Sequence, residues 1–370
     1  GKRLGEFSLA EDQAFILEQI LGVISAEAPD AVIIAGDVYD KTVPPAEAVQ
    51  LFSDFITAVS RKKITCFIIS GNHDSPERIA FGSEIMSVGG VHLSPVYNGT
   101  VTPVTLEDEF GRVNFYMLPF VKPSTVRRCL SSEDLQSYGE AIAAAVWEMD
   151  IDKTERNVLI THQFVTGAEL SESEDISAGG TESVPADIFS GFDYTALGHI
   201  HRPQNIGSER IRYCGTPLKY SFSEAAQQKS VTVVELGEKG TLDVKTVPLV
   251  PLHDMVELRG SYDELTDKAF LESGGHGEDY VRIILTDEED VPDALAKLRL
   301  RYHNLMRLDY DNKRTRHSVL LPDLAEDENK PPIELFSEFY ELRNNQPMSS
   351  EQRSFMEKLI GAVWDCSDTE

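Results

Sequence analysis

The first 220 residues alternate amphipathic stretches with short apolar runs. Residues 11–28 and 46–62 repeat apolar side chains at helical spacing, which predicts two helices. Residues 212–222 and 229–236 have β character. Four other runs are short and apolar, as expected for buried strands: 31–36, 64–70, 157–162 and 192–198. Alternating helices and strands of this kind predict an α/β fold.

The pattern changes near residue 250, which predicts further domains. Residues 251–321 read as strand, helix, strand, helix, strand, the pattern of a small α/β domain. Residues 322–332, PDLAEDENKPP, are acidic and end in proline, which is typical of a linker. We therefore expect a first domain at 1–250, the small domain, the linker, and a helical segment at 333–370.

Two amphipathic helices are predicted in this last segment. Their apolar faces comprise Leu335, Phe336, Phe339, Tyr340 and Leu342, followed by Phe355, Met356, Leu359, Ile360 and Val363. Such faces after a linker indicate a docking surface for a partner protein. The alternative is that both helices pack on the body of the protein.

Composition narrows the class of protein. The chain has 370 residues, of which 41% are hydrophobic and 26% charged, so a packed core is expected and wholesale disorder is not. No apolar run approaches the length that spans a bilayer. The four cysteines are scattered without a C-x-x-C pair, which favours a reducing cytoplasm: Cys66, Cys129, Cys214 and Cys366.

The charge distribution is uneven. A net charge of -28 argues against a polyanionic partner. Residues 297–317 nevertheless carry seven Lys or Arg and only two Asp. This stretch is either a solvated surface or a patch that contacts phosphates. On the second interpretation the candidate DNA contacts are Arg299, Arg301, Lys313 and Arg314.

Candidate chemistry gathers where the early strands end. Four predicted strands run into polar residues of metal-binding type, and ligand sites of α/β sheets lie beyond the carboxyl ends of strands. These residues are Asp37 and Asp40, then Asn72, His73 and Asp74, then His162, then His199 and His201. Glycines at 36, 71 and 198 allow tight turns before three of these groups.

The residue types indicate which ions would bind. Carboxylate, amide oxygen and imidazole suit Mn²⁺, Fe²⁺ or Zn²⁺, and the lack of cysteine argues against structural zinc. Taken singly, each motif also has an ordinary explanation, as a polar core histidine or an Asn-based turn. The ordered set G-D-x-x-D, G-N-H-D, T-H, G-H-x-H instead favours a two-metal phosphoesterase.

The set resembles the calcineurin-like metallophosphoesterases, and more closely the SbcD family, the bacterial nuclease subunit that pairs with the SbcC ATPase. AGDVYDKTVPP, GNHDSPER, YTALGHIHRPQ and YCGTPLKYSFSEA carry the resemblance in this order. It implies an αββα sandwich, with two mixed sheets flanked by helices, followed by a small capping domain and a C-terminal helical pair. It also implies two metal ions, manganese in this family, and cleavage of DNA ends and hairpins.

The resemblance assigns roles to residues. It implies that Asp37 bridges two metals, that Asn72, His162 and His199 complete one site, and that His201 belongs to the other. It further implies that His73 lies beside the scissile phosphate and that Asp74 orients the His73 ring. Asp40 would contact the metal ligands without binding a metal itself. The implied partners are DNA and an SMC-type ATPase bound through the C-terminal helices. The implied assembly is a homodimer within a heterotetramer, with helix 46–62 near the subunit contact.

One part of the family pattern is not found. The family begins with a strand ending in Asp-x-His before Leu-Gly, and this chain opens with GKRLG. We expect a sequence that starts inside the protein; the alternative is a homologue without catalysis that serves as a docking subunit. A third alternative keeps the metal centre but gives it a nucleotide or another phosphodiester as substrate.

Overall fold

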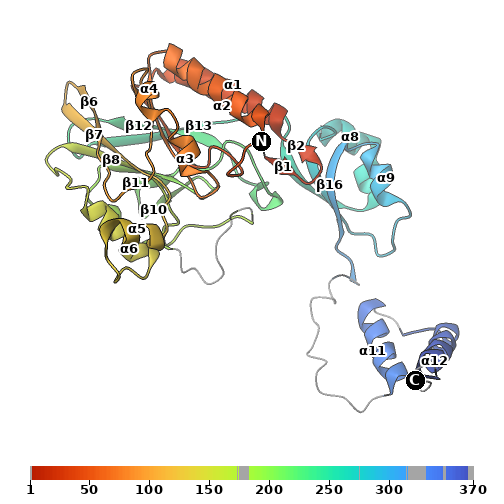
Figure 1. Cartoon of the computed structure of the whole chain (residues 1–370). Coiled ribbons are helices and arrows are strands. Elements are labelled where there is room, and N and C mark those ends of the chain that lie inside the picture. Colours follow the sequence, from red (N-terminus) through yellow and green to blue (C-terminus); the bar gives the residue numbers. More distant parts are fainter. Residues whose placement is uncertain are drawn as a thin grey trace. The chain divides into compact units, whose positions relative to one another are not determined.

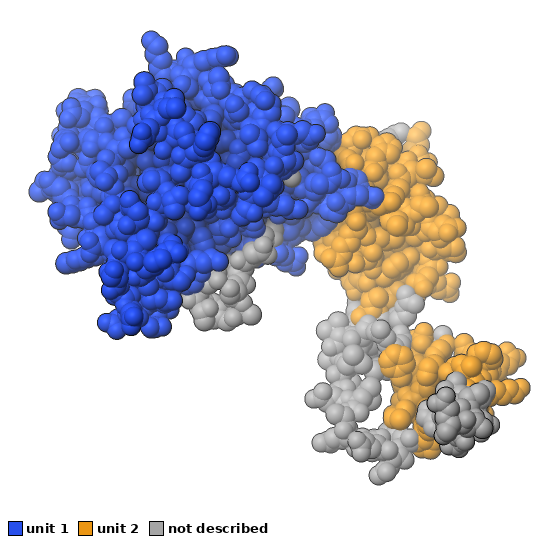
Figure 2. All heavy atoms as spheres, in the orientation of Figure 1, with its two compact units in different colours: residues 1–255 blue, residues 256–370 orange. Residues whose placement is uncertain are grey.

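The computed structural model describes residues 2–172, 174, 183–274, 276–313, 315, 331–344 and 347–365, with the backbone alone at 272, 273, 342, 343 and 361–365. The chain divides into two compact units, residues 1–255 and 256–370 (Figure 2). No helix among these residues is long and apolar enough to cross a membrane.

A six-stranded sheet organises the first unit, in the order β10-β11-β9-β8-β7-β6 (Figure 1). Its four central strands run parallel, and β6 and β10 pair antiparallel at the two edges. The strands are β6 Val104–Asp108, β7 Gly111–Leu118, β8 Arg156–His162, β9 Tyr194–Gly198, β10 Gln204–Ile206 and β11 Ser208–Tyr213.

A second sheet of three parallel strands contains β3 Ala31–Ala35, β4 Thr65–Ile69 and β5 Val91–Leu93. Two antiparallel pairs complete the unit, β1 Arg3–Leu4 with β2 Phe7–Ser8 and β12 Ser230–Leu236 with β13 Leu242–Pro248. The helices of the unit are α1 Ala10–Glu27, α2 Ala46–Arg61, α3 Pro76–Ile79, α4 Ser83–Ser87, α5 Pro123–Leu130 and α6 Tyr138–Trp147, with short η1 Ala186–Phe189 and η2 Phe222–Glu224.

Alternation along β4 explains how the layers stack, since successive side chains of a strand point to opposite faces. Cys66 and Ile68 pack into the core beneath α1 and α2. Phe67 and Ile69 pack the other way, into the core shared with the six-stranded sheet, where the Phe67 and Phe115 rings stack with centroids 4.4 Å apart.

The outer face of the six-stranded sheet is covered by α5 and α6, which lie on the side of the unit away from α1 and α2 (Figure 1). Leu159 of β8 packs there against Val126 and Ile142. The layer order is therefore helices, three-stranded sheet, six-stranded sheet, helices, which confirms the predicted αββα sandwich. The prediction of two mixed sheets is wrong for the three-stranded sheet, because its strands all run parallel.

The second unit holds a three-stranded sheet of β14 Met255–Gly260, β15 Tyr280–Leu285 and β16 Asn304–Tyr310. Helices α7 Tyr262–Thr266, α8 Lys268–Gly274 and α9 Ala294–Arg299 accompany it, and Leu265, Ile283 and Leu298 lie in its buried core. Helices α11 Pro332–Asn344 and α12 Ser350–Asp365 follow. Ser349 and Gln352 form a capping box at the start of α12, since each side chain accepts a hydrogen bond from the other residue's backbone N–H.

The helices and strands predicted from apolar runs are present, with ends shifted by one or two residues. The prediction of β structure throughout 212–222 is wrong, because β11 ends at Tyr213. Gly215 then adopts a φ of +79° and Pro217 follows, so the chain leaves the ladder. The predicted linker lies outside the described residues, except for its last two positions.

Candidate metal centre

Four side chains meet at the carboxyl ends of β3, β4, β8 and β9. Ligand atoms of Asp37, His162 and His199 all lie within 4.8 Å of one another. The Asn72 Oδ1 atom lies 3.0 Å from His162 Nε2 and 3.0 Å from His199 Nδ1. The structure thus brings together the four residues that the resemblance assigns to one metal site, two from each of the two facing sheets.

Two glycines allow these groups to approach so closely. A Cβ atom at Gly198 would lie 1.8 Å from the Ala35 carbonyl oxygen and 2.6 Å from His162 Nδ1. A Cβ atom at Gly71 would lie 2.1 Å from Asp37 Oδ1. Since real contacts are never this short, a side chain at either position would push two ligand-bearing strand ends apart.

The hydrogen bonds of His162 fix its tautomer. Its Nδ1 atom lies 2.7 Å from the Ala35 carbonyl oxygen, which only accepts, so Nδ1 carries the proton. In the neutral ring Nε2 then presents a lone pair to Asp37 Oδ2 at 3.1 Å and Asn72 Oδ1 at 3.0 Å. Three electron-rich atoms that face one another are the donor set of a cation, and imidazole, amide and carboxylate suit Mn²⁺, Fe²⁺ or Zn²⁺. The residues present therefore fit a divalent metal.

The electrostatics of His199 and Asp37 agree with this fit. Burial, assisted by nearby His162, lowers the pKa of His199 to about 3, so its ring is neutral at physiological pH. Burial opposes ionisation of Asp37, but attraction to His162 and hydrogen bonds outweigh it and lower the pKa of this carboxyl. Burial also opposes the charged form of His162, and the Asp37 carboxylate outweighs it and raises the pKa of that ring.

The predicted catalytic pair, His73 and Asp74, lies in the loop after β4. The His73 backbone N–H donates to Asp37 Oδ1 at 3.0 Å, which ties this loop to the metal ligand. The buried Asp74 carboxylate accepts from the backbone N–H groups of Val38, Tyr39 and Gly71 at 2.9–3.1 Å. Asp74 thus joins the loops after β3 and β4, and its predicted effect on the His73 ring stays a prediction.

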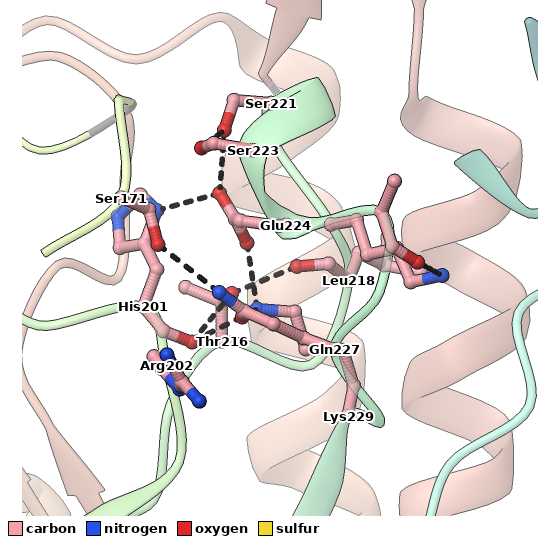
Figure 3. A network of polar contacts seen from close by, with 12 residues as sticks. Ser171, His201, Arg202, Thr216, Leu218, Ser221, Ser223, Glu224, Gln227 and Lys229 are labelled. Atoms are coloured by element: carbon pink, nitrogen blue, oxygen red, sulfur yellow. Dashed lines mark hydrogen bonds and ion pairs between the residues drawn. The ribbon is translucent and has the colours of Figure 1, made fainter. Parts of the chain in front are cut away.

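Asp40 and His201 lie outside the four-residue cluster. Asp40 pairs with Lys2 Nζ at 2.6 Å. His201 Nδ1 lies 3.3 Å from Glu224 Oε1, and its backbone N–H donates to Glu174 Oε1 at 2.7 Å. Figure 3 shows Glu224 between His201 and Lys229. No sequence pattern predicted a role for Glu174, Glu224 or Lys229, although Glu224 lies inside the motif YCGTPLKYSFSEA, where it is the only acidic residue.

The basic stretch of the second unit is partly neutralised. Arg307 and Arg282 both contact Asp309, and Arg259 pairs with Asp311. Of the four predicted DNA contacts, three have exposed side chains, and Arg314 lies outside the described residues; the three are Arg299, Arg301 and Lys313.

The C-terminal helices keep much of their apolar faces exposed. Phe355 is 65% exposed and Leu359 is 46% exposed. A groove of about 360 Å³ runs between α11 and α12 and is lined mainly by apolar side chains: Phe336, Tyr340, Met348, Glu351, Gln352, Phe355 and Met356. The side chains of Leu342 and Val363, predicted for these faces, lie outside the described set.

Comparison with known proteins agrees with the fold and the site. Residues 10–203 match the family model of calcineurin-like phosphoesterases, and residues 251–344 match the model described as the type 5 capsule protein repressor C-terminal domain. The SbcD subunit of the nuclease SbcCD from Staphylococcus saprophyticus is 31% identical over 98% of this chain and 96% of its own length. That of Staphylococcus epidermidis is 30% identical over 99% and 96%. This chain therefore belongs to the SbcD family of nuclease subunits, within the calcineurin-like phosphoesterases.

Proposed function

We propose that this protein is a manganese-dependent DNA nuclease subunit that hydrolyses phosphodiesters at DNA ends and hairpins. One observation carries the proposal. Asp37, Asn72, His162 and His199 converge on one point, in a chain 31% identical to a nuclease subunit over nearly its full length. We also propose that it acts in the cytoplasm, where Cys66, Cys129 and Cys214, which form no disulfide within the described part of the chain, would stay reduced.

The proposal gives each predicted residue a task. Asp37, Asn72, His162 and His199 would hold one divalent ion, and Asp37 and His201 would contribute to a second. When bound, such a pair of ions supplies Lewis acidity toward a phosphate and lowers the pKa of water. The Ala35 carbonyl keeps the His162 lone pair directed at the ligand cluster, and burial keeps His199 neutral and ready to bind.

We assign the half-buried His73 to the scissile phosphate. Its backbone bond to Asp37 holds the residue beside the metal ligands, so its ring is within reach of a phosphate bound there. A neutral imidazole donates a hydrogen bond to the departing oxygen, and a protonated one donates the proton itself. Asp74 supports this geometry through the three backbone N–H groups that it accepts.

DNA would contact the second unit through Arg299, Arg301 and Lys313, with Arg314 as a fourth expected contact. Basic side chains that contact phosphates position a duplex without reading its sequence, so cleavage should be largely independent of sequence. Because the whole chain carries a net charge of -28, DNA affinity without a partner should be weak and should fall further with salt.

The partner we propose is an SMC-type ATPase that binds the exposed faces of α11 and α12, with two copies of each chain in a heterotetramer. Phe355 and Leu359 support this, because large apolar side chains this exposed are typical of interfaces. Replacing both with Asp should abolish ATPase binding and leave the melting temperature unchanged. A lowered melting temperature without partner would show instead that these helices pack on the body of the protein.

The test of the proposal is cleavage of linear duplex and hairpin DNA by the protein as its gene encodes it, with the ATPase partner and Mn²⁺, Fe²⁺ or Zn²⁺. Asp37→Asn should abolish cleavage, and Asp134→Asn, at an exposed position between α5 and α6, is the matched control. Blocking both DNA ends separates exonuclease from endonuclease activity. Bound metal without cleavage of any DNA would refute the proposal, and nucleotides and other diesters would be tried next.

A further inference from the structure

A buried ion pair lies directly behind His201 (Figure 3). Glu224, which has no exposed surface, places Oε1 at 3.3 Å from the Nδ1 atom of His201. Its other oxygen, Oε2, accepts from Lys229 Nζ at 2.6 Å, and Lys229 is only 3% exposed. Charged groups are almost never buried this completely unless they are paired, as Glu224 and Lys229 are.

Besides its contact with Glu224, Lys229 also contacts His201 directly, at the backbone carbonyl. An ammonium group has three N–H donors. Lys229 directs them at Glu224 Oε2, at the His201 carbonyl oxygen at 2.8 Å, and at Gln227 Oε1 at 2.9 Å. The His201 ring and the His201 carbonyl are therefore held by the two members of one ion pair.

Both backbone polar groups of His201 are also engaged. Its backbone N–H donates to Glu174, and its carbonyl oxygen accepts from the Thr216 N–H at 3.0 Å as well as from Lys229. The edge of the Tyr220 ring contacts the imidazole, with ring centroids 5.8 Å apart. A buried ion pair contributes little net stability compared with apolar packing, so its use here points to orientation of this one residue.

We infer that Glu224 and Lys229 are positioning residues that orient His201 and set its tautomer. Glu224 accepts the Nδ1–H, so Nε2 keeps the lone pair through which His201 would bind a metal. Lys229 prevents the Glu224 carboxylate from turning away and fixes the backbone on the other side of the ring. The inference rests on the proposed function only in treating His201 as a metal ligand.

The first experiment reads the tautomer directly. Protein labelled with ¹⁵N-histidine is stripped of metal and measured by NMR at about pH 8, above the ordinary histidine pKa. The His201 signal is identified among nine histidines by its loss in His201→Gln. We expect a single tautomer with the proton on Nδ1. A wild-type ring that carries its proton on Nε2 would overturn the inference without any variant of the pair.

The second experiment removes both charges together, since removing one alone would leave the other buried without its partner. Glu224→Leu/Lys229→Met should give a mixture of tautomers and should weaken Mn²⁺ binding at the His201 site by roughly 10–100-fold in calorimetry. The matched control is Glu27→Leu/Lys245→Met, which removes a surface pair of the same composition, with Lys245 exposed and Glu27 half-buried, and should change neither measurement. An unchanged tautomer and unchanged Mn²⁺ binding in the double variant would overturn the inference.

These measurements need neither DNA nor the ATPase. If the protein fails to cut DNA while the double variant loses the single tautomer of His201, the positioning role stands and the nuclease proposal fails. If the protein cuts DNA while the double variant keeps tautomer and Mn²⁺ affinity, the positioning role fails and the nuclease proposal stands.

Discussion

The substitution Gly198→Ala tests the close packing of the metal centre. The added Cβ would lie 1.8 Å from the Ala35 carbonyl oxygen and 2.6 Å from His162 Nδ1, both in the packed interface between β3, β8 and β9. A carbon and an oxygen normally approach to about 3.3 Å, so the backbone must move by more than about 1 Å. Alanine has no rotamer that relieves such a contact.

The stability lost in Gly198→Ala has two parts. Overpacking a close-packed interior costs about 1–3 kcal/mol. Separating β3 from β8 also breaks the hydrogen bond between the His162 ring and the Ala35 carbonyl, which is worth about 1 kcal/mol. We therefore expect the free energy of unfolding to fall by about 2–4 kcal/mol. Because Asp37 lies two residues beyond Ala35, the same movement displaces a ligand, and Mn²⁺ affinity should fall by roughly 10-fold or more.

Urea denaturation of the metal-free protein measures the first effect, and calorimetric titration with Mn²⁺ measures the second. Gly22→Ala is the matched control, because a Cβ there meets nothing within 4 Å and the residue lies inside α1. Alanine favours a helix, so this control should unfold at the same urea concentration or a higher one. If Gly198→Ala unfolds with the control and binds Mn²⁺ like the wild type, the packing argument is refuted.

Three further predictions concern the metal, pH and DNA. Asp37→Asn should abolish Mn²⁺ binding in calorimetry, and retained binding would show that Asp37 is not a metal ligand. Hydrogen bonds from Arg156 lower the pKa of Asp108 below its ordinary 3.8, so the stability they add is present above that pH and is lost as pH falls through the lowered native value. Asp108→Asn should therefore lower the free energy of unfolding at neutral pH by about 1 kcal/mol at most, because solvent at this carboxylate weakens the pairing. The difference in urea midpoint between variant and wild type should vanish in acid, and a difference that persists there contradicts the pairing. Arg299→Gln/Arg301→Gln should reduce the slope of log binding constant against log salt concentration by the amount expected for about two phosphate contacts. An unchanged slope would show that DNA binds elsewhere on the protein.

The sequence determined the layers of the first unit and the position of the metal cluster. The apolar runs at 31–36, 64–70, 157–162 and 192–198 appear as β3, β4, β8 and β9. Local alternation sets which faces are buried, and parallel strands bring their carboxyl ends to one place. Residues at or just beyond the ends of those runs were expected to meet there, and the resemblance then singled out Asp37, Asn72, His162 and His199 as one set.

The sequence pattern failed where the chain does not follow a regular period. β structure was expected through 212–222, but the backbone turns at Gly215. The sequence also did not show the ion pairs of the basic stretch near residue 300, where Arg307 pairs with Asp309, as does Arg282 of the neighbouring strand. An ion pair depends on which strands lie side by side, and a count of charges along the chain does not contain that information.

Only the tertiary structure decided how the ligands are held. The Ala35 carbonyl that fixes His162 belongs to another strand 127 residues away. The pair of Glu224 and Lys229 reaches His201 across 23 and 28 residues, and no spacing rule connects them. A local pattern determines which side chains lie at the sheet edge, because the two-residue period of a strand sets the face to which each side chain points. The partners that fix the proton and rotation of each ring come from separate segments, and they meet only after the layers have packed.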